Sequence, residues 1–172
     1  MEIELRGLKE GINPLHTTCS PESLDLEGSD LHCTSQIVAD LILTKSDPIF
    51  SIKGSLCCSA RLVCARCLSE FEIELRAPFE QLLHRKEKGT PTEAESDEIT
   101  FFAPRALSVD LSEEVRDALI LALPIKPLCS EDCLGLCPSC GKNLNEEKCT
   151  CQQEQTDARW SKLVSLKKQT EV

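Results

Sequence analysis

Cysteine is the residue type that most constrains this chain, because 12 of its 172 residues are cysteines and six of these fall within residues 129–151. The chain starts with the charged run Met1–Arg6 and shows no apolar signal core, so we expect a reducing, cytoplasmic location. Clustered cysteines in a reducing compartment indicate a metal site before they indicate disulfides. No stretch approaches the roughly 18–20 apolar residues of a membrane-spanning helix, so no membrane association is expected.

Eight of the cysteines occur in four short motifs with the spacing of metal ligands. The motifs are Cys64-Ala-Arg-Cys67, Cys129-Ser-Glu-Asp-Cys133, Cys137-Pro-Ser-Cys140 and Cys149-Thr-Cys151. Two thiolates on a tight turn form a zinc knuckle. In the third motif Pro138 fixes φ within the turn, and Gly141 permits a positive φ directly after the second ligand. Segment 129–151 is therefore predicted to bind metal, and zinc fits best.

Other chemistry remains possible for these thiols. Cys64 and Cys67 would suit a redox dithiol, but that motif normally opens a helix, whereas here a strand pattern continues beyond Cys67. Four thiolates also suit an iron–sulfur cluster, although the third motif fits mononuclear zinc better. Catalytic zinc usually keeps an open position among histidine and carboxylate ligands, while closed all-cysteine sites are structural.

The remaining thiols and imidazoles carry no ligand pattern. We interpret four cysteines as small buried or incidental thiols: Cys19, Cys33, Cys57 and Cys58. Three histidines are expected at the surface, far along the chain from the cysteine motifs: His16, His32 and His84. The sequence shows no phosphate-binding glycine loop, nucleophile elbow or convincing carboxylate pair, so we expect a protein that is not an enzyme.

Alternating apolar residues predict the fold. Period-2 patterns over residues 37–43, 50–63 and 71–75 indicate an antiparallel meander, with a turn at residues 46–48. The pattern Asp110-Leu-Ser-Glu113 is typical of a capping box, and a helical apolar stripe then runs to Pro124. We predict an α+β fold: an antiparallel, barrel-like β-meander with one main helix, a zinc-knuckle cysteine-rich segment and a C-terminal helix.

Four regions are expected along the chain. Residues 1–34 form an N-terminal strand and a loop that begins where Gly11–Pro14 breaks the alternation, and residues 35–128 form the meander and helix. Residues 129–151 form the cysteine-rich zinc-binding segment, and residues 152–172 form a helical tail.

The charge of the chain restricts its partners. With 29 acidic and 19 basic residues the formal net charge is -10, and only five Phe and one Trp are available for stacking on bases. Phosphate neutralisation by basic groups supplies most nucleic-acid affinity. We therefore expect weak binding to naked RNA, which leaves a basic protein or a protein–RNA particle as partner.

The order of motifs resembles a known family. The resemblance rests on five features: Cys64-Ala-Arg-Cys67-Leu68, Asp110-Leu111, the helix end Leu-Ala-Leu-Pro124, the run from Pro127 to Cys151, and Asp157-Ala-Arg159-Trp160. Together they resemble the YceD family of large ribosomal RNA subunit accumulation proteins of bacteria and plastids. The resemblance implies a role in 23S rRNA accumulation or processing in the cytoplasm, without known catalytic activity, and a ribosomal protein or pre-large-subunit particle as partner.

The resemblance also implies a ligand pairing with two zinc ions per chain. Cys64 and Cys67 pair with Cys129 and Cys133, while Cys137 and Cys140 pair with Cys149 and Cys151. A basic cluster in the tail is the expected partner contact: Arg159, Lys162, Lys167 and Lys168. The alternative is a zinc-dependent or thiol-based enzyme, such as an RNA-processing nuclease or a redox sensor.

Overall fold

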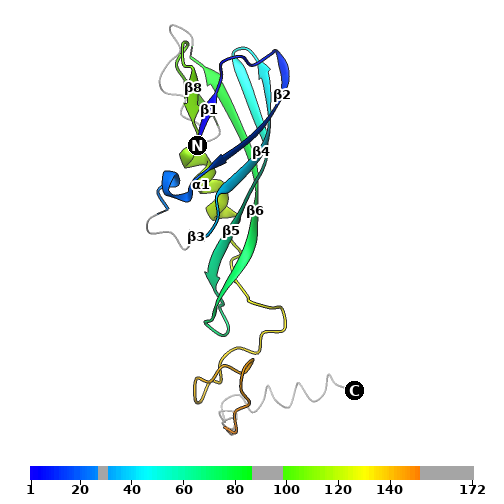
Figure 1. The fold of residues 1–172 in the computed structure, drawn as a ribbon, viewed down its shortest axis with the longest axis vertical. Helices are drawn as coiled ribbons and strands as arrows, with labels where there is room; N and C mark the ends of the chain where they lie inside the picture. The colour runs from blue at the N-terminus through cyan, green and yellow to red at the C-terminus, as the bar shows by residue number, and fades with distance from the viewer. Residues whose placement is uncertain (27–30, 87–98, 152–172) are drawn as a thin grey trace, which may run out of the picture. The chain divides into compact units, whose positions relative to one another are not determined.

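Alternating apolar side chains build most of this protein into one sheet. The computed structural model describes residues 1–26, 31–86 and 99–151. These described residues fall into two units, one within residues 1–65 and 69–131 and the other within residues 66–68 and 132–151. The elements are β1 Glu2–Glu4, β2 Gly11–Cys19, η1 Pro21–Leu24, β3 His32–Cys33, β4 Ile37–Ser46, β5 Ile49–Val63, β6 Glu70–Arg85, β7 Ile99–Phe102, β8 Ser108–Asp110 and α1 Ser112–Leu121. In the first unit the strand order is β2-β4-β5-β6-β7, with β3 paired to β5, while β1 and β8 form a separate two-stranded sheet (Figure 1).

The predicted antiparallel meander is confirmed by β4, β5 and β6. Strand β4 buries every second residue from Ile37 to Leu43, which is the period expected of a strand with one face against the core. Strands β5 and β6 pair antiparallel along their length, from Ile49 opposite His84 to Val63 opposite Glu70. The turn between them contains the first cysteine knuckle, so this hairpin determines where that knuckle lies.

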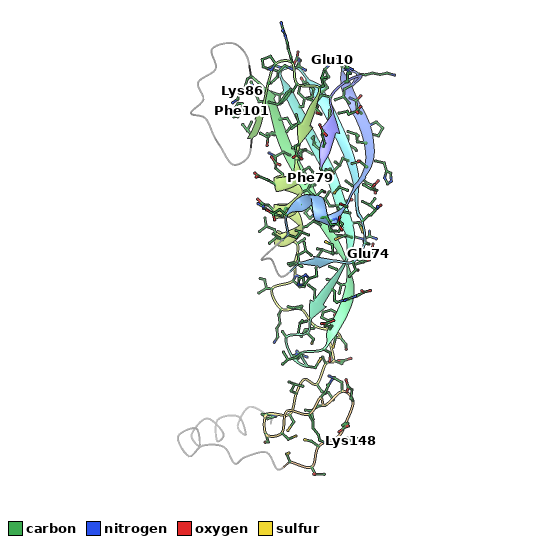
Figure 2. All side chains as sticks on the ribbon, turned by 60° about the vertical axis from the view of Figure 1, so that its left-hand side comes forward. Glu10, Glu74, Phe79, Lys86, Phe101 and Lys148 are labelled. Carbon is green, nitrogen blue, oxygen red and sulfur yellow. The ribbon has the colours of Figure 1, made fainter. Side chains whose placement is uncertain are left out.

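The core lies between this sheet and the helix (Figure 1). Val115 and Leu119 of α1 are fully buried, and Phe79 of β6, labelled in Figure 2, lines a crevice beside α1. At the C-terminal end of β6, beside Leu83 and Arg85, the rings of Phe50 and Phe102 meet edge to face with centroids 5.4 Å apart. None of the helices in the described residues is long and apolar enough to cross a membrane.

The prediction of a barrel-like sheet is wrong. Among the described residues β2 pairs only with β4, and β7 pairs only with β6, so the two edges of the sheet do not meet. The apolar face that a barrel would close on itself is covered by α1, η1 and the β1–β8 pair, whose buried residues Ile3, Leu24 and Val109 belong to the same core. The predicted C-terminal helix falls in residues 152–172, outside the described residues.

The predicted break at Gly11–Pro14 is also wrong, because β2 runs from Gly11 to Cys19 through Pro14. Pro14 has no backbone N–H to donate, which excludes it from central strands but not from edge strands. β2 lies at an edge of the sheet, with Pro14 opposite Ile42 of β4. An edge position therefore accommodates the proline that the sequence pattern treats as a break.

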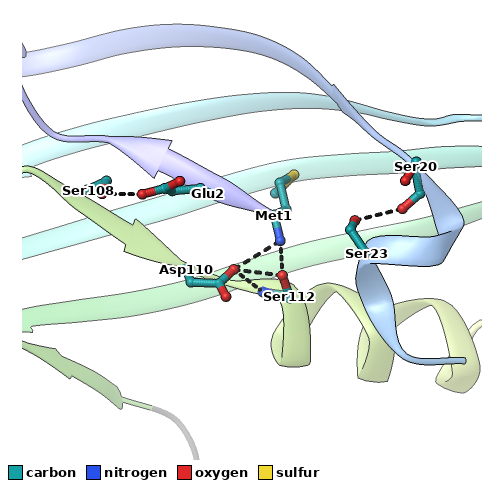
Figure 3. A network of polar contacts seen from close by, with 7 residues as sticks. All are labelled: Met1, Glu2, Ser20, Ser23, Ser108, Asp110 and Ser112. Atoms are coloured by element: carbon teal, nitrogen blue, oxygen red, sulfur yellow. Dashed lines mark hydrogen bonds and ion pairs between the residues drawn. The ribbon is translucent and has the colours of Figure 1, made fainter.

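The start of α1 differs in detail from the predicted capping box. Its N-cap residue is Leu111, so Glu113 lies in the first turn and the reciprocal box is not formed. The Asp110 carboxylate nevertheless accepts a hydrogen bond from the Ser112 amide at 3.1 Å and pairs with the Met1 ammonium at 3.0 Å (Figure 3). The ammonium also contacts the Ser112 hydroxyl, and Glu2 contacts Ser108, so β1 is fastened to the chain that leads into the helix.

Candidate metal centre

The first knuckle occupies the turn between β5 and β6. Cys64 is fully buried and Cys67 nearly so, and the Cys64 amide donates to the Ser69 carbonyl at 3.0 Å across the turn. Leu68, directly after the second cysteine, has a φ of 60°, a left-handed conformation that is unusual for a leucine. The turn therefore has the tight geometry that the Cys-x-x-Cys spacing predicts.

Within the first unit, the chain after α1 returns to this knuckle. The Ala65 amide donates to the Pro127 carbonyl at 2.8 Å, which places the knuckle beside the stretch that leads to Cys129. Cys129 itself is exposed. The hydrogen bond explains how residues 64 and 129, far apart in sequence, approach one another.

Within the second unit, Arg66 holds the chain around Cys133. Its guanidinium donates to the Cys133 carbonyl at 2.9 Å, and its own carbonyl accepts from the Leu136 amide at 3.2 Å. Gly135 adopts a φ of 78°, and a β-carbon there would lie 3.1 Å from the Arg66 carbonyl oxygen. Only glycine fits both the conformation and the space without strain.

The sulfur atoms of the first predicted ligand set lie close together. Those of Cys64, Cys67, Cys129 and Cys133 are all within 4.8 Å of one another. Tetrahedral zinc with Zn–S bonds of about 2.3 Å separates its sulfur ligands by about 3.8 Å. The four thiols fit such an ion after small side-chain adjustments, and an all-cysteine donor set is that of a closed structural site.

The second set lies entirely within the second unit. The sulfur atoms of Cys137, Cys140, Cys149 and Cys151 are also all within 4.8 Å of one another. The Gly141 amide donates to the Cys137 carbonyl at 2.9 Å, and Gly141 has a φ of 72°, which confirms the positive φ predicted after this cysteine pair. The Cys137 amide donates to the Lys142 carbonyl at 2.8 Å, which closes the knuckle.

Hydrogen bonds to sulfur favour the ligand form of this knuckle. The backbone N–H groups of Cys140 and Ser139 point at the Cys137 sulfur and, together with the Cys149 thiol, lower the pKa of Cys137 to about 6. The pKa of Cys151 is raised to about 12, first because its thiol donates to Cys140 and then because of burial. Thiolates are the ligands of zinc, so N–H groups aimed at Cys137 prepare it for metal binding.

Asn145 contacts one of the predicted ligands, Cys133, although no sequence motif predicts that contact. Its amide nitrogen donates to the Cys133 sulfur at 3.4 Å, while its amide oxygen accepts from the Leu134 backbone at 2.8 Å. Asn143 supports it by accepting from the same amide nitrogen at 2.8 Å. The available signal is the Asn-x-Asn spacing inside a cysteine-rich loop, since asparagine both shapes turns and donates to thiolates.

The other candidate residues lie elsewhere. His16 is exposed and its ring nitrogen lies 2.5 Å from the Asp40 carboxylate, and neither His32 nor His84 joins a group of metal ligands within the described residues. The predicted partner contacts lie outside the described residues: Arg159, Lys162, Lys167 and Lys168. The four remaining cysteines are partly or fully buried, as the sequence predicts.

Comparison with known proteins places both cysteine sets within one family match. Residues 52–167 match the family described as large ribosomal RNA subunit accumulation protein YceD. An uncharacterised protein of Mycobacterium tuberculosis strain H37Rv is 31% identical over 153 residues, which are 88% of this chain and 72% of the relative.

Two plant relatives are similar over shorter stretches. The large ribosomal RNA subunit accumulation protein YCED homolog 1 of Arabidopsis thaliana, a chloroplast protein, is 37% identical over 68 residues, 40% of this chain and 21% of the relative. The protein of the same name from Zea mays is 35% identical over 57 residues, 33% of this chain and 20% of the relative. No solved structure matches the chain.

Proposed function

This chain belongs to the YceD family of large ribosomal RNA subunit accumulation proteins, and we propose from that premise that it is a non-catalytic, zinc-binding factor for large ribosomal subunit biogenesis. Its proposed effect is to support the accumulation or processing of 23S rRNA. The observation that carries the proposal is that the family match over residues 52–167 contains both four-cysteine groups, each with its sulfurs within 4.8 Å.

The proposed role of zinc is structural. Cys64, Cys67, Cys129 and Cys133 would hold one ion, and Cys137, Cys140, Cys149 and Cys151 a second. A bound zinc would neutralise part of the charge of four clustered thiolates and fix loops that contain little regular secondary structure. The chain's own contribution is to orient the sulfurs, through Arg66 and Asn145 around Cys133 and through backbone N–H groups around Cys137.

The proposed mode of action is binding to a protein or to an assembling particle. The net charge of -10 opposes direct attraction to RNA phosphates. A ribosomal protein is basic, as a rule, because it must contact rRNA, so its surface complements an acidic factor. The basic cluster Arg159, Lys162, Lys167 and Lys168 is the proposed contact with RNA or protein within that particle.

The proposal is tested in the native host by depleting the protein and measuring the ratio of large-subunit to small-subunit rRNA. We expect the ratio to fall, and a copy with the wild-type sequence to restore it. A copy carrying Cys137→Ser and Cys140→Ser should fail to restore it, because those thiols are proposed ligands. The control Cys57→Ser removes a thiol outside both groups and should restore the ratio. An unchanged ratio after depletion would overturn the proposal.

The absence of catalysis is part of the proposal and has its own test. The donor sets contain only cysteine, and no histidine or carboxylate among the described residues completes either group as an open, catalytic site. We expect zinc-loaded protein to leave precursor large-subunit rRNA uncut under conditions in which a ribonuclease control cleaves it. Cleavage that disappears in the Cys137→Ser variant would instead favour a zinc-dependent nuclease.

A further inference from the structure

Two cysteines outside both metal groups lie in contact in the first unit. The sulfur atoms of Cys33 and Cys58 are 3.6 Å apart. Cys33 belongs to the short strand β3, where it pairs with Ala60 of β5. Cys58 lies two residues from Ala60 on β5, so both cysteine side chains project from the same face of the sheet.

The surroundings of the two thiols differ. Cys58 is 3% exposed and belongs to the hydrophobic core, whereas Cys33 is only partly buried at its edge. Hydrogen bonds hold the two segments together, from the Thr34 amide to the Ser59 carbonyl and from the Ser59 amide to the Ser35 hydroxyl, each 2.8 Å long. An oxidant in solution therefore meets Cys33 first, with Cys58 fixed behind it.

The hydrogen bond between the thiols also makes Cys33 the more reactive of the two. The hydrogen bond between the two thiols lowers the pKa of Cys33, because a Cys33 thiolate accepts from the Cys58 thiol. The same hydrogen bond, together with burial, raises the pKa of Cys58. Since the thiolate is the nucleophile in disulfide exchange, Cys33 is the attacking group and Cys58 the group that resolves the mixed disulfide.

We propose that Cys33 and Cys58 are a modification site that forms a reversible disulfide with a low-molecular-weight disulfide, such as oxidised glutathione, as the oxidant. The Cys33 thiolate attacks one glutathione sulfur, forming a mixed disulfide and releasing one glutathione thiolate. Cys58 loses its proton and attacks the Cys33 sulfur, which releases the second glutathione. Both protein thiols are oxidised, and one glutathione disulfide is reduced to two glutathione molecules. The sulfurs need to approach by about 1.5 Å to reach the S–S bond length.

This site goes beyond the proposed role in ribosome biogenesis and does not depend on it. The disulfide would close the chain between residues 33 and 58, a loop that contains all of β4, and would join the two-residue strand β3 covalently to β5. Closing a loop restricts the unfolded chain, so the oxidised protein should melt at a higher temperature than the reduced protein.

The test uses the full, zinc-loaded chain in a glutathione buffer with the oxidised form in excess. After acid quenching, alkylation and digestion with trypsin, mass spectrometry detects the linkage between peptides 10–45 and 54–61, which contain Cys19 with Cys33 and Cys57 with Cys58. We expect the linked pair, a loss of two titratable thiols, unchanged zinc content and full reversal by dithiothreitol.

Four single variants assign the bond. Cys33→Ser and Cys58→Ala should abolish the linked pair, while Cys19→Ser and Cys57→Ser should retain it. Cys57 is the matched control, because it neighbours Cys58 on β5 but its thiol donates to Glu74 at 3.2 Å (Glu74 is labelled in Figure 2). If Cys58→Ala fails to fold, Cys33→Ser at its partly exposed site decides the assignment. A linked pair that persists in Cys33→Ser, or none in the wild type, would overturn the proposal.

Discussion

At the scale of single residues, both knuckles require a left-handed backbone directly after their second cysteine. Gly141 adopts it with a φ of 72° after Cys140, and Leu68 adopts it with a φ of 60° after Cys67. A β-carbon in this conformation costs roughly 1–2 kcal/mol, which glycine avoids. The first knuckle therefore holds a strained residue where the second holds the favoured one.

The strain at Leu68 leads to a stability prediction. Leu68 is 64% exposed, so its side chain contributes little burial, and Leu68→Gly should raise the free energy of unfolding by about 1 kcal/mol. Thermal unfolding of the zinc-loaded protein measures the change. The control Leu134→Gly, at a leucine that is 67% exposed and has a negative φ, should lower stability through backbone entropy. Destabilisation by both variants to the same extent would contradict the account.

Much of the site is predictable at this scale, and the rest depends on contacts between distant residues. The eight cysteines and the positive φ at Gly141 follow from motifs a few residues long. The roles of Arg66 and Asn145 do not, because each acts on Cys133 through a hydrogen bond that exists only in the folded chain, across 67 residues for Arg66 and across 12 for Asn145. The contact between Cys33 and Cys58 cannot be predicted from sequence motifs either, because it depends on how β3 pairs with β5.

At the scale of elements, patterns predict strands better than they predict how strands pair. Alternation identifies β4, β5 and β6, which follow one another in the sequence and pair in the same order in the sheet. Strand β7 pairs parallel with β6, with Ile99 opposite Leu82, and alternation contains no information on that direction. Pro14 leads to a wrong prediction of a break in β2, because the sequence pattern does not show that this strand lies at an edge of the sheet.

The start of α1 yields a prediction with a pH dependence. The Ser112 hydroxyl and then the Met1 ammonium hold the pKa of Asp110 below its usual range. A lowered folded-state pKa gives stability that is complete above the unfolded pKa, about 4, and is lost as the pH falls through the folded value. Asp110→Asn removes the negative charge but keeps an acceptor oxygen, and Asp110 is exposed, so the variant should be less stable by only about 0.5 kcal/mol at pH 7 and by less towards pH 2.

Urea unfolding at the two pH values measures this difference. Asp117→Asn is the control, since Asp117 lies further along α1 and pairs with its neighbour Arg116 at 3.1 Å. That variant should differ little from the wild type at either pH, because an exposed ion pair contributes little. An Asp110→Asn effect that is the same at pH 7 and pH 2 would contradict the assignment to the carboxylate.

At the scale of the whole molecule, the acidic charge of the chain favours the proposed indirect route to rRNA over direct binding. The net charge of -10 and the scarcity of aromatic residues disfavour naked RNA as the ligand. A composite surface of protein and RNA avoids that difficulty, because basic ribosomal proteins supply the charge that this chain lacks. The acidic composition and the family membership are then compatible.

The acidic charge of the chain predicts weak binding to bare RNA. A large-subunit rRNA fragment should bind the pure protein with a Kd of about 10⁻⁶ M or weaker at physiological salt, and added salt should abolish the binding. Filter binding over a salt series measures it. Changing Arg159, Lys162, Lys167 and Lys168 to Glu should also lower large-subunit rRNA in cells whose only copy is this variant. Submicromolar, salt-resistant binding would contradict the indirect route, and normal rRNA would exclude the tail as the contact.

The central claim, that two all-cysteine sites each hold one zinc ion, is tested most directly by elemental analysis of the purified chain and two variants. We predict two zinc ions per wild-type chain and one in each of Cys64→Ser and Cys140→Ser, because each variant removes a ligand from a different group of four sulfurs. A wild-type chain with iron or no metal, or a Cys64→Ser chain that keeps two zinc ions, would contradict the account.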